Sequence, residues 1–372
     1  MRILSGIDLP FAASCGSMIL CDDVYQRLHG EKNQVRFLAL ATNEDTNWSK
    51  LPDIILLNVK KQYDRNDYST YVSTLSKFVE EQVQDFKPDI IHIQHFGFGM
   101  ALAFSQISDI PKLAICHGTD VLFSMKDMFH RNNLKRIVAS ASGLLFPTWS
   151  MYRKFLTIAS HTNPMNVVNW GIPDNLLIDS KKRYGHSQYP CKLLYAGRLT
   201  PNKNVEVIIN AVSILQKDVR LTIIGEGEEK QRLVDKVDKL NLSGQIKFSD
   251  FMPRDVLWKE FENHDILIIP TKDIEAFCLL AVEAQAHGIP VFHSNVGGLS
   301  EIIGESGIIF DPLRADDLAN QIRNVFSKPE LLREVSEVGA LNAGRFPISK
   351  TAQQFLDVST RMLNSLKYRV NC

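Results

Sequence analysis

The sequence predicts an α/β protein that is built from two doubly wound parallel sheets, each in its own domain. Short apolar runs alternate with amphipathic stretches along the chain, which is the pattern of β-α-β units with right-handed crossovers. With 372 residues and 45% hydrophobic content, the chain can fill two cores of ordinary size. A polar stretch rich in turn formers, residues 171–191, separates the two halves and is the expected linker.

The apolar runs are expected as strands and the stretches between them as helices. In the first half these runs are MRIL, QVRFLAL, DIILLNV, DIIHIQH, KLAICHG and GLLFP. The second half repeats the rhythm with KLLYAG, VRLTIIG, QIKFSD, DILIIP and IPVFHS. A final periodic segment lacks a following strand and is expected as a helix, 350–369, that returns to the first domain. The predicted domains are 1–175 with that helix, and 185–348.

Charge and cysteine usage argue against several classes of protein. Lys plus Arg and Asp plus Glu both number 42, so no strong field favours nucleic acid or an anionic membrane. The cysteines at 15, 21, 116, 191, 278 and 372 form no C-x-x-C pair and are expected to be reduced thiols. No signal peptide and no apolar run of bilayer length is visible. We expect a soluble cytoplasmic protein with at most peripheral membrane contact, through the locally basic residues 125–138.

The stretch EAFCLLAVE, residues 275–283, combines two carboxylates with an expected helix start. The strand ILIIP precedes it, so Glu275 should lie in a loop, the helix should begin near Cys278, and Glu283 should lie on its second turn. The unpaired amides of a helix start attract phosphate. This stretch therefore predicts a phosphorylated ligand whose hydroxyl groups the two carboxylates hold.

Two further motifs of the second half fit a diphosphate. In LLYAGRLTPNKN, Gly197 ends a strand, and Arg198 and Lys203 follow before the next helix. A guanidinium and an ammonium there can bind a diphosphate, although a charged surface loop is the simpler alternative for this motif alone. The turn at Gly225 and Gly227 is too short for a dinucleotide fingerprint and is expected to lie near a nucleoside.

The first half offers a histidine and aromatic residues at expected strand ends. His117, in HGTD, follows the KLAIC strand and should face the interdomain cleft, although a lone histidine is usually structural. His92 and His95 should lie on opposite faces, and no carboxylate or cysteine pattern completes a metal site. Phe96 and Phe98 could instead form the wall of an acceptor pocket.

Together these motifs resemble the family 4 retaining glycosyltransferases, whose GT-B architecture places two Rossmann-like domains with parallel sheets facing across a cleft. The matching motifs are E-x7-E, AGRLTPNKN, the G-x-G turn, VGGLSEII and HGTD, in the family's order. The resemblance implies a nucleotide diphosphate sugar as donor, with a UDP-hexose or UDP-N-acetylhexosamine favoured. It also implies retention of the anomeric configuration, with neither a cofactor nor a metal.

The resemblance also implies roles for individual residues. Arg198 and Lys203 would hold the diphosphate, Glu283 the ribose and Glu275 the sugar hydroxyls, with His117 beside the sugar. His117, Arg198, Lys203 and Glu275 are thus the expected catalytic group. The residues expected to bind the donor are Gly16, Arg198, Lys203, Gly225, Met252, Glu275, Phe277, Cys278, Leu279 and Glu283. Those expected to bind the acceptor are Phe96, Phe98, Asp120 and Phe123, although Asp120 could simply cap a helix.

The sequence departs from the family pattern at Ala276 and Cys278, where many members carry glycine, and at Cys15, beside Gly16. A backbone amide survives such a change, so phosphate binding can persist. The favoured acceptor is a small soluble natural-product aglycone or polar metabolite. The alternatives are an intermediate of cell-surface polysaccharide or lipid-linked sugar assembly, a non-catalytic nucleotide-sugar-binding subunit, and an epimerase or phosphorylase of the same architecture.

Overall fold

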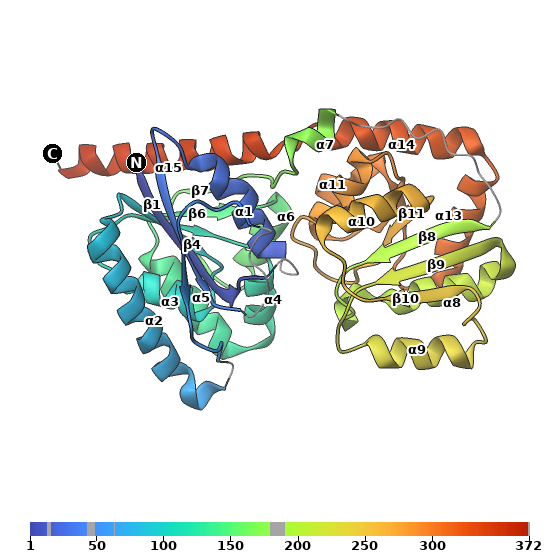
Figure 1. Cartoon of the computed structure of the whole chain (residues 1–372), viewed down its shortest axis with the longest axis horizontal. Helices are drawn as coiled ribbons and strands as arrows, with labels where there is room; N and C mark the ends of the chain where they lie inside the picture. The colour runs from blue at the N-terminus through green and yellow to red at the C-terminus, as the bar shows by residue number, and fades with distance from the viewer. Residues whose placement is uncertain (13–15, 43–48, 63, 179–189, 371–372) are drawn as a thin grey trace. The chain divides into compact units, whose positions relative to one another are not determined.

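The computed structural model describes residues 1–12, 16–42, 49–62, 64–178 and 190–370. Cys15, Cys372 and residues 179–189 of the expected linker lie outside these ranges. The chain divides into two compact units, Met1–Gly171 with Ile348–Cys372, and Ile172–Pro347. Figure 1 colours both along the chain.

The first unit is built on a seven-stranded parallel sheet with the order β3-β2-β1-β4-β5-β6-β7. The order reverses between β1 and β4, and ligands of doubly wound sheets bind beyond the carboxyl ends of the strands at such a point. The strands are β1 (Arg2–Pro10), β2 (Gln34–Leu40), β3 (Ile54–Leu57), β4 (Ile90–Gln94), β5 (Lys112–Ile115), β6 (Gly143–Phe146) and β7 (Met165–Val167).

Helices cover both faces of this sheet, with α1 packed against α15 and α3 packed against α2 and α5. Side-chain caps fix several helix starts: Asp64 accepts a hydrogen bond from the Asn66 amide before α2, and Thr148 from the Met151 amide before α6. The helices are α1 (Gly16–Leu28), α2 (Arg65–Phe86), α3 (Gly99–Ser105), α4 (Thr119–Lys126), α5 (Met128–Ser140), α6 (Trp149–Leu156) and α15 (Ile348–Val370).

The second unit repeats this plan with a six-stranded parallel sheet in the order β10-β9-β8-β11-β12-β13. Its switch point lies between β8 and β11. The strands are β8 (Cys191–Ala196), β9 (Val219–Ile224), β10 (Ile246–Ser249), β11 (Ile266–Ile269), β12 (Val291–Ser294) and β13 (Ile308–Phe310). The α-helices are α7 (Asp174–Ile178), α8 (Val205–Leu215), α9 (Lys230–Lys239), α10 (Arg254–Glu260), α11 (Leu279–Ala286), α12 (Gly297–Ile302), α13 (Ala315–Phe326) and α14 (Pro329–Ala343).

The prediction of two parallel Rossmann-like sheets is confirmed, and the element bounds differ in detail. The first unit ends at Gly171 instead of 175, because the Ile172 amide donates to the Phe346 carbonyl (2.9 Å) and Ile172 bridges to Pro347. Helix α7 lies where a linker was expected, and α15 begins at Ile348 instead of 350. The three-residue edge strands β7 and β13 were not predicted.

Candidate functional site

The predicted phosphate motif lies at the switch point of the second sheet. Strand β8 ends just before Gly197, and β11 leads into the loop that carries Glu275. Helix α11 begins at Leu279 with Cys278 as its N-cap, as the sequence indicates. The first amides of a helix have no acceptor within it, so this loop and the Arg198 loop can provide cations and amide donors for an anion.

Lys203 and Glu275, which are 72 positions apart, form an ion pair in which Lys203 Nζ donates to Glu275 Oε2. Thr271 Oγ1 donates to the same oxygen at 3.2 Å. Both of these hydrogen bonds end on Oε2, so Oε1 can accept a hydrogen bond from a ligand. Burial by itself would lower the pKa of Lys203, but the attraction of Glu275 outweighs it and raises that pKa. Lys203 is therefore a cation throughout the neutral range.

Arg198 lies close enough to Lys203 for the two cations to repel each other, and its side chain is exposed. Its backbone is fixed instead, because the buried Tyr195 donates its hydroxyl hydrogen to the Arg198 carbonyl at 2.8 Å. Because the loop is fixed and the side chain is exposed, the Arg198 guanidinium can turn toward an anion. The structure thus brings Arg198, Lys203 and Glu275 into one unit, on elements that the strand order holds together.

Glycines bring three loops of this site into close backbone contact. A Cβ on Gly225 (φ 142°) would lie 2.0 Å from the Gly197 carbonyl oxygen, and one on Gly227 (φ 155°) would lie 2.2 Å from the Leu199 carbonyl oxygen. A Cβ on Gly298 would lie 2.4 Å from the Ala276 carbonyl oxygen. The G-x-G turn and the VGG motif therefore position the two loops that carry the charged residues.

Cys278 adopts the left-handed backbone conformation (φ 73°, ψ 75°), which favours glycine. Burial, followed by repulsion from Glu275, raises the pKa of the Cys278 thiol to about 12. The thiol is therefore neutral at physiological pH and adds no charge to the site.

Glu283 is held by two residues that the sequence analysis missed. Arg254 donates through Nε to Glu283 Oε1 (2.7 Å), and Trp258 donates through Nε1 to Oε2 (3.1 Å). Both donors come from α10, where they are one helical turn apart. An Arg-x-x-x-Trp pair just after the DFMP loop was the available signal. Its partner could not be read from the sequence, because Glu283 lies on another element.

The remaining predicted donor residues are more scattered. Met252 is half-buried in the loop between β10 and α10, whereas the Phe277 side chain is fully buried against Phe346, with ring centroids 5.6 Å apart. Only the backbone of Phe277 can therefore meet a ligand. Leu279 is the first residue of α11. Gly16 begins α1 in the first unit, and residues 13–15 just before it lie outside the described ranges.

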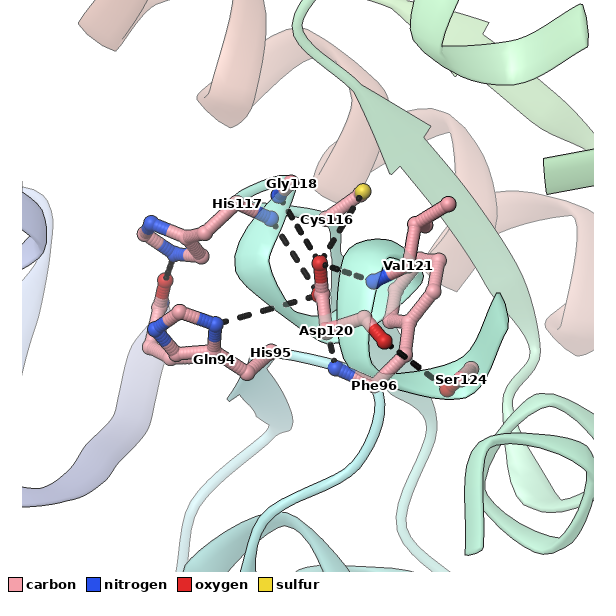
Figure 2. Close-up of polar contacts among 9 residues, drawn as sticks. All are labelled: Gln94, His95, Phe96, Cys116, His117, Gly118, Asp120, Val121 and Ser124. Atoms are coloured by element: carbon pink, nitrogen blue, oxygen red, sulfur yellow. Dashed lines mark hydrogen bonds and ion pairs between the residues drawn. The ribbon is translucent and has the colours of Figure 1, made fainter. Parts of the chain in front are cut away.

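In the first unit, His117 and His95 stack at the carboxyl end of the sheet, with ring centroids 4.2 Å apart (Figure 2). His117 Nε2 lies 2.8 Å from Gln94 Oε1, whereas its Nδ1 is buried and has no hydrogen-bond partner among the described residues. Burial lowers the pKa of His117 to about 3. His117 is thus a neutral imidazole whose second nitrogen remains available.

Asp120 does not fit the predicted acceptor role. Its carboxylate is 1% exposed and accepts hydrogen bonds from the amides of Phe96 (2.9 Å), His117 (3.3 Å), Gly118 (2.8 Å) and Val121 (3.0 Å), as Figure 2 shows. Burial raises the pKa of Asp120, and these amides oppose that shift. Asp120 therefore fixes the backbone around His117. It is not the N-cap that the alternative expected, because Gly118 is the N-cap of α4 and Asp120 lies in the first turn of that helix.

The aromatic residues predicted to bind the acceptor divide into two groups. Phe96 is fully buried and packs against Phe146 and Phe155, with centroids 5.6 and 5.9 Å away, so it belongs to the core and cannot line a pocket. Phe98 is 8% exposed beside His95, whereas Phe123 is 43% exposed. Of the predicted acceptor residues, only Phe98 and Phe123 therefore have an exposed part of the side chain that a ligand could touch.

Other features of the described chain do not add to this site. His92 is a core residue that hydrogen-bonds to Tyr25 and Ser359, and no group of three or more His, Cys, Asp or Glu among the described residues is placed to hold a metal ion. Within the same ranges, no helix has both the length and the apolar character of a membrane span. A cavity of about 550 Å³ beside α2 and α5 contains none of the predicted site residues.

Comparisons with known proteins show which proteins this chain is similar to. Residues 179–341 match the family model for glycosyl transferases group 1. Glycogen synthase from Mycobacterium tuberculosis (strain CDC 1551 / Oshkosh) is 26% identical over 266 residues, which are 66% of this chain and 62% of the relative. A D-inositol 3-phosphate glycosyltransferase from Segniliparus rotundus is 28% identical over 171 residues, 44% of this chain and 38% of the relative. This chain thus spans less than two thirds of the length of either relative.

Solved structures with lower identity share the fold over nearly the whole chain. Sucrose-phosphate synthase from Thermosynechococcus elongatus superposes with a TM-score of 0.83 at 18% identity, covering 98% of this chain and 99% of its own. Anabaena HepE in complex with UDP and glucose superposes with a TM-score of 0.78 at 16% identity, covering 97% and 99%. Residues 179–341 therefore resemble the glycosyl transferases group 1 family, and the chain as a whole has the GT-B fold of these solved structures.

Proposed function

We propose that the chain is a family 4 retaining glycosyltransferase that moves a hexose or N-acetylhexosamine from a nucleotide diphosphate sugar to a hydroxyl group. The observation that carries the proposal is the Arg198, Lys203 and Glu275 arrangement beside the start of α11 at the sheet switch point. UDP is the favoured nucleotide, in line with the UDP and glucose in the HepE complex.

The site residues suit the charges of this reaction. The bond between the anomeric carbon and the diphosphate oxygen breaks, the acceptor oxygen bonds to that carbon, and the hydroxyl proton leaves with the diphosphate. Negative charge grows on the diphosphate, where Arg198, Lys203 and the first amides of α11 are preorganised donors. Glu275 holds Lys203 through Oε2, and its Oε1 can accept a hydrogen bond from a sugar hydroxyl group.

The ribose is assigned to Glu283. Arg254 and Trp258 hold this carboxylate in one orientation, and a carboxylate can accept about four hydrogen bonds. Glu283 can therefore accept two further hydrogen bonds, one from each ribose hydroxyl group. The acceptor is proposed to be a small aglycone or polar metabolite, and sugar chains of cell-surface or lipid-linked glycans are the second choice. The protein is proposed to work in the cytoplasm without a metal ion.

The test is sugar transfer by the purified chain with UDP-glucose, UDP-galactose, UDP-N-acetylglucosamine, GDP-glucose and ADP-glucose, each against a mixed panel of phenolic and sugar acceptors. We expect nucleotide release from a UDP-sugar together with a product of added hexose mass and an α anomeric coupling by NMR. A β-linked product would contradict retention. Nucleotide binding without release from any donor would favour the non-catalytic subunit, and an isomerised sugar nucleotide would favour an epimerase.

A further inference from the structure

A chain of buried hydrogen bonds runs through the first unit and has a defined direction. It starts on α15, where Ser359 Oγ donates to the Phe355 carbonyl at 2.7 Å. The Ser359 oxygen therefore accepts from His92 Nε2, 2.8 Å away. His92 Nδ1 is then the unprotonated nitrogen, and it accepts the hydroxyl hydrogen of Tyr25 at 3.0 Å.

The same reasoning orients the Gln94 side chain. Ser5 Oγ donates to the His92 carbonyl at 3.0 Å, so its lone pairs accept from Gln94 Nε2 at 2.9 Å. The Tyr25 oxygen also accepts from Gln94 Nε2, at 2.6 Å. The amide group of Gln94 thus faces two acceptors, and its carbonyl oxygen faces His117 Nε2 at 2.8 Å (Figure 2).

A carbonyl oxygen only accepts hydrogen bonds, so the proton of the neutral His117 ring lies on Nε2. Its Nδ1 then carries a bare lone pair, and this buried atom has no partner among the described residues. The His117 ring also packs against His95 and Trp170, with ring centroids 4.2 and 5.3 Å away. Buried acceptors almost always have a partner in proteins, and a bound ligand can supply it here.

We propose that Gln94 is a positioning residue that fixes the Nε2–H tautomer of His117, so that Nδ1 accepts a hydrogen bond from a hydroxyl group of the bound sugar. The identity of the ligand rests on the proposed function, whereas the tautomer does not. A bare nitrogen lone pair favours a hydroxyl donor and repels a phosphate oxygen. The role of His117 is then to recognise the sugar, and it is not a cation for the diphosphate.

The tautomer can be read directly from the full-length chain labelled with ¹⁵N-histidine. Long-range ¹H–¹⁵N correlation at pH 7 should show His117 with a protonated Nε2 and an unprotonated Nδ1, with the signal assigned through its loss in His117→Gln. A wild-type ring that is protonated at Nδ1 or at both nitrogens overturns the proposal.

Three variants test whether Gln94 fixes the tautomer of His117 or only supports the fold. Gln94→Leu should give a mixture of tautomers and lower kcat/KM for UDP-glucose turnover roughly five- to tenfold, with UDP affinity unchanged within twofold. Gln94→Glu retains an acceptor oxygen and should keep the Nε2–H tautomer and part of the activity. Gln106→Leu is the control, because Gln106 is exposed and bonds to Ser76 in the same unit. A folded Gln94→Leu protein with the wild-type tautomer would refute the assignment.

The ligand is tested with UDP-glucose against UDP alone. The Nδ1 resonance of His117 should move when UDP-glucose binds and stay within error when UDP binds, because only the former has sugar hydroxyls. Equal shifts with both, or no shift while both bind, would refute the hydroxyl contact. If neither binds, the hydroxyl contact fails together with the proposed function, and the tautomer measurement still decides the role of Gln94.

Discussion

At the scale of single residues, Cys278 has a left-handed backbone conformation at a position where many members of the family that the chain resembles carry glycine. A side chain other than glycine at φ 73° is strained, yet the N-cap geometry of α11 is kept. The motif resemblance identified the cysteine at this position. It could not show that the residue adopts the left-handed conformation, because that depends on contacts from elsewhere in the fold.

Replacing Cys278 should separate the backbone strain from the loss of the thiol. Cys278→Gly and Cys278→Ala both remove the sulfur, but only glycine relaxes the left-handed backbone, so the glycine variant should be the more stable by about 1 kcal/mol. Urea denaturation of both variants measures this difference. An alanine variant at least as stable as the glycine variant would show that the strain is absent.

His95 is a second strained residue, with φ 67°, and it is fully surrounded by the fold. Burial, followed by repulsion from His117 and Lys61, lowers the pKa of His95 well below its ordinary value, and Asp120 lies 3.8 Å from its Nδ1. The unfolded chain binds a proton at His95 below about pH 6.5, and the folded chain does not. His95 therefore lowers the free energy of unfolding as the pH falls below about 6.5.

His95→Asn should remove that cost, because asparagine tolerates the left-handed backbone and does not titrate. Between pH 6 and 4 the free energy of unfolding should fall less steeply in the variant, by up to about 1.4 kcal/mol per pH unit. Urea titrations at several pH values give the two slopes. Parallel slopes for the variant and the wild type would contradict a buried neutral His95.

At the scale of elements, the long apolar strands could be predicted, because a strand that is buried on both faces must be continuously apolar. The short edge strands β7 and β13 lack such a run, and their partly exposed residues give little signal. Helix α7 is only five residues long and lies among turn-forming residues, so the composition of this stretch predicts a linker. The G-x-G turn was predicted as a turn, whereas its close contact with the β8 loop needed the tertiary structure.

Gly225→Ala tests whether this contact positions the site. The added methyl group would lie 2.0 Å from the Gly197 carbonyl oxygen, so the β8 and β9 loops must separate. We expect a loss of more than about 3 kcal/mol of stability and of UDP binding. Gly244→Ala is the matched control, because nothing lies within 4 Å of its Cβ position. Similar unfolding curves for the two variants would contradict the close approach.

At the scale of the whole molecule, both units use one strand order and place their polar residues at the carboxyl ends of the strands around the switch point. Predictions for the second unit placed Arg198 and Lys203 between β8 and α8, and Glu275 and Cys278 between β11 and α11. These loops were predictable because an apolar strand precedes each of them. Predictions for the first unit were weaker. Phe96 proved to be a core residue, and Asp120 binds backbone amides instead of a ligand.

The partners of these residues could not be predicted, because hydrogen bonds between distant elements leave no local pattern. Arg254 and Trp258 reach Glu283 from another helix, and Gln94 meets His117 from the neighbouring strand. The sequence therefore predicts which residues carry charge at a strand end. The structure is needed to show which atoms of those residues remain available to a ligand.

The most direct test of the donor site is calorimetric titration of the wild-type chain, Arg198→Ala and Arg333→Ala with UDP, GDP and ADP. Arg333 is the control, since it is exposed on α14 and pairs with Glu337. We expect one nucleotide, UDP, to bind to the wild type and to the control. We expect Arg198→Ala to bind it more than about tenfold more weakly, because a hydrogen bond to a charged group contributes roughly 1.5–3 kcal/mol. Absence of binding by all three nucleotides, or equal affinity of Arg198→Ala, would contradict the donor site.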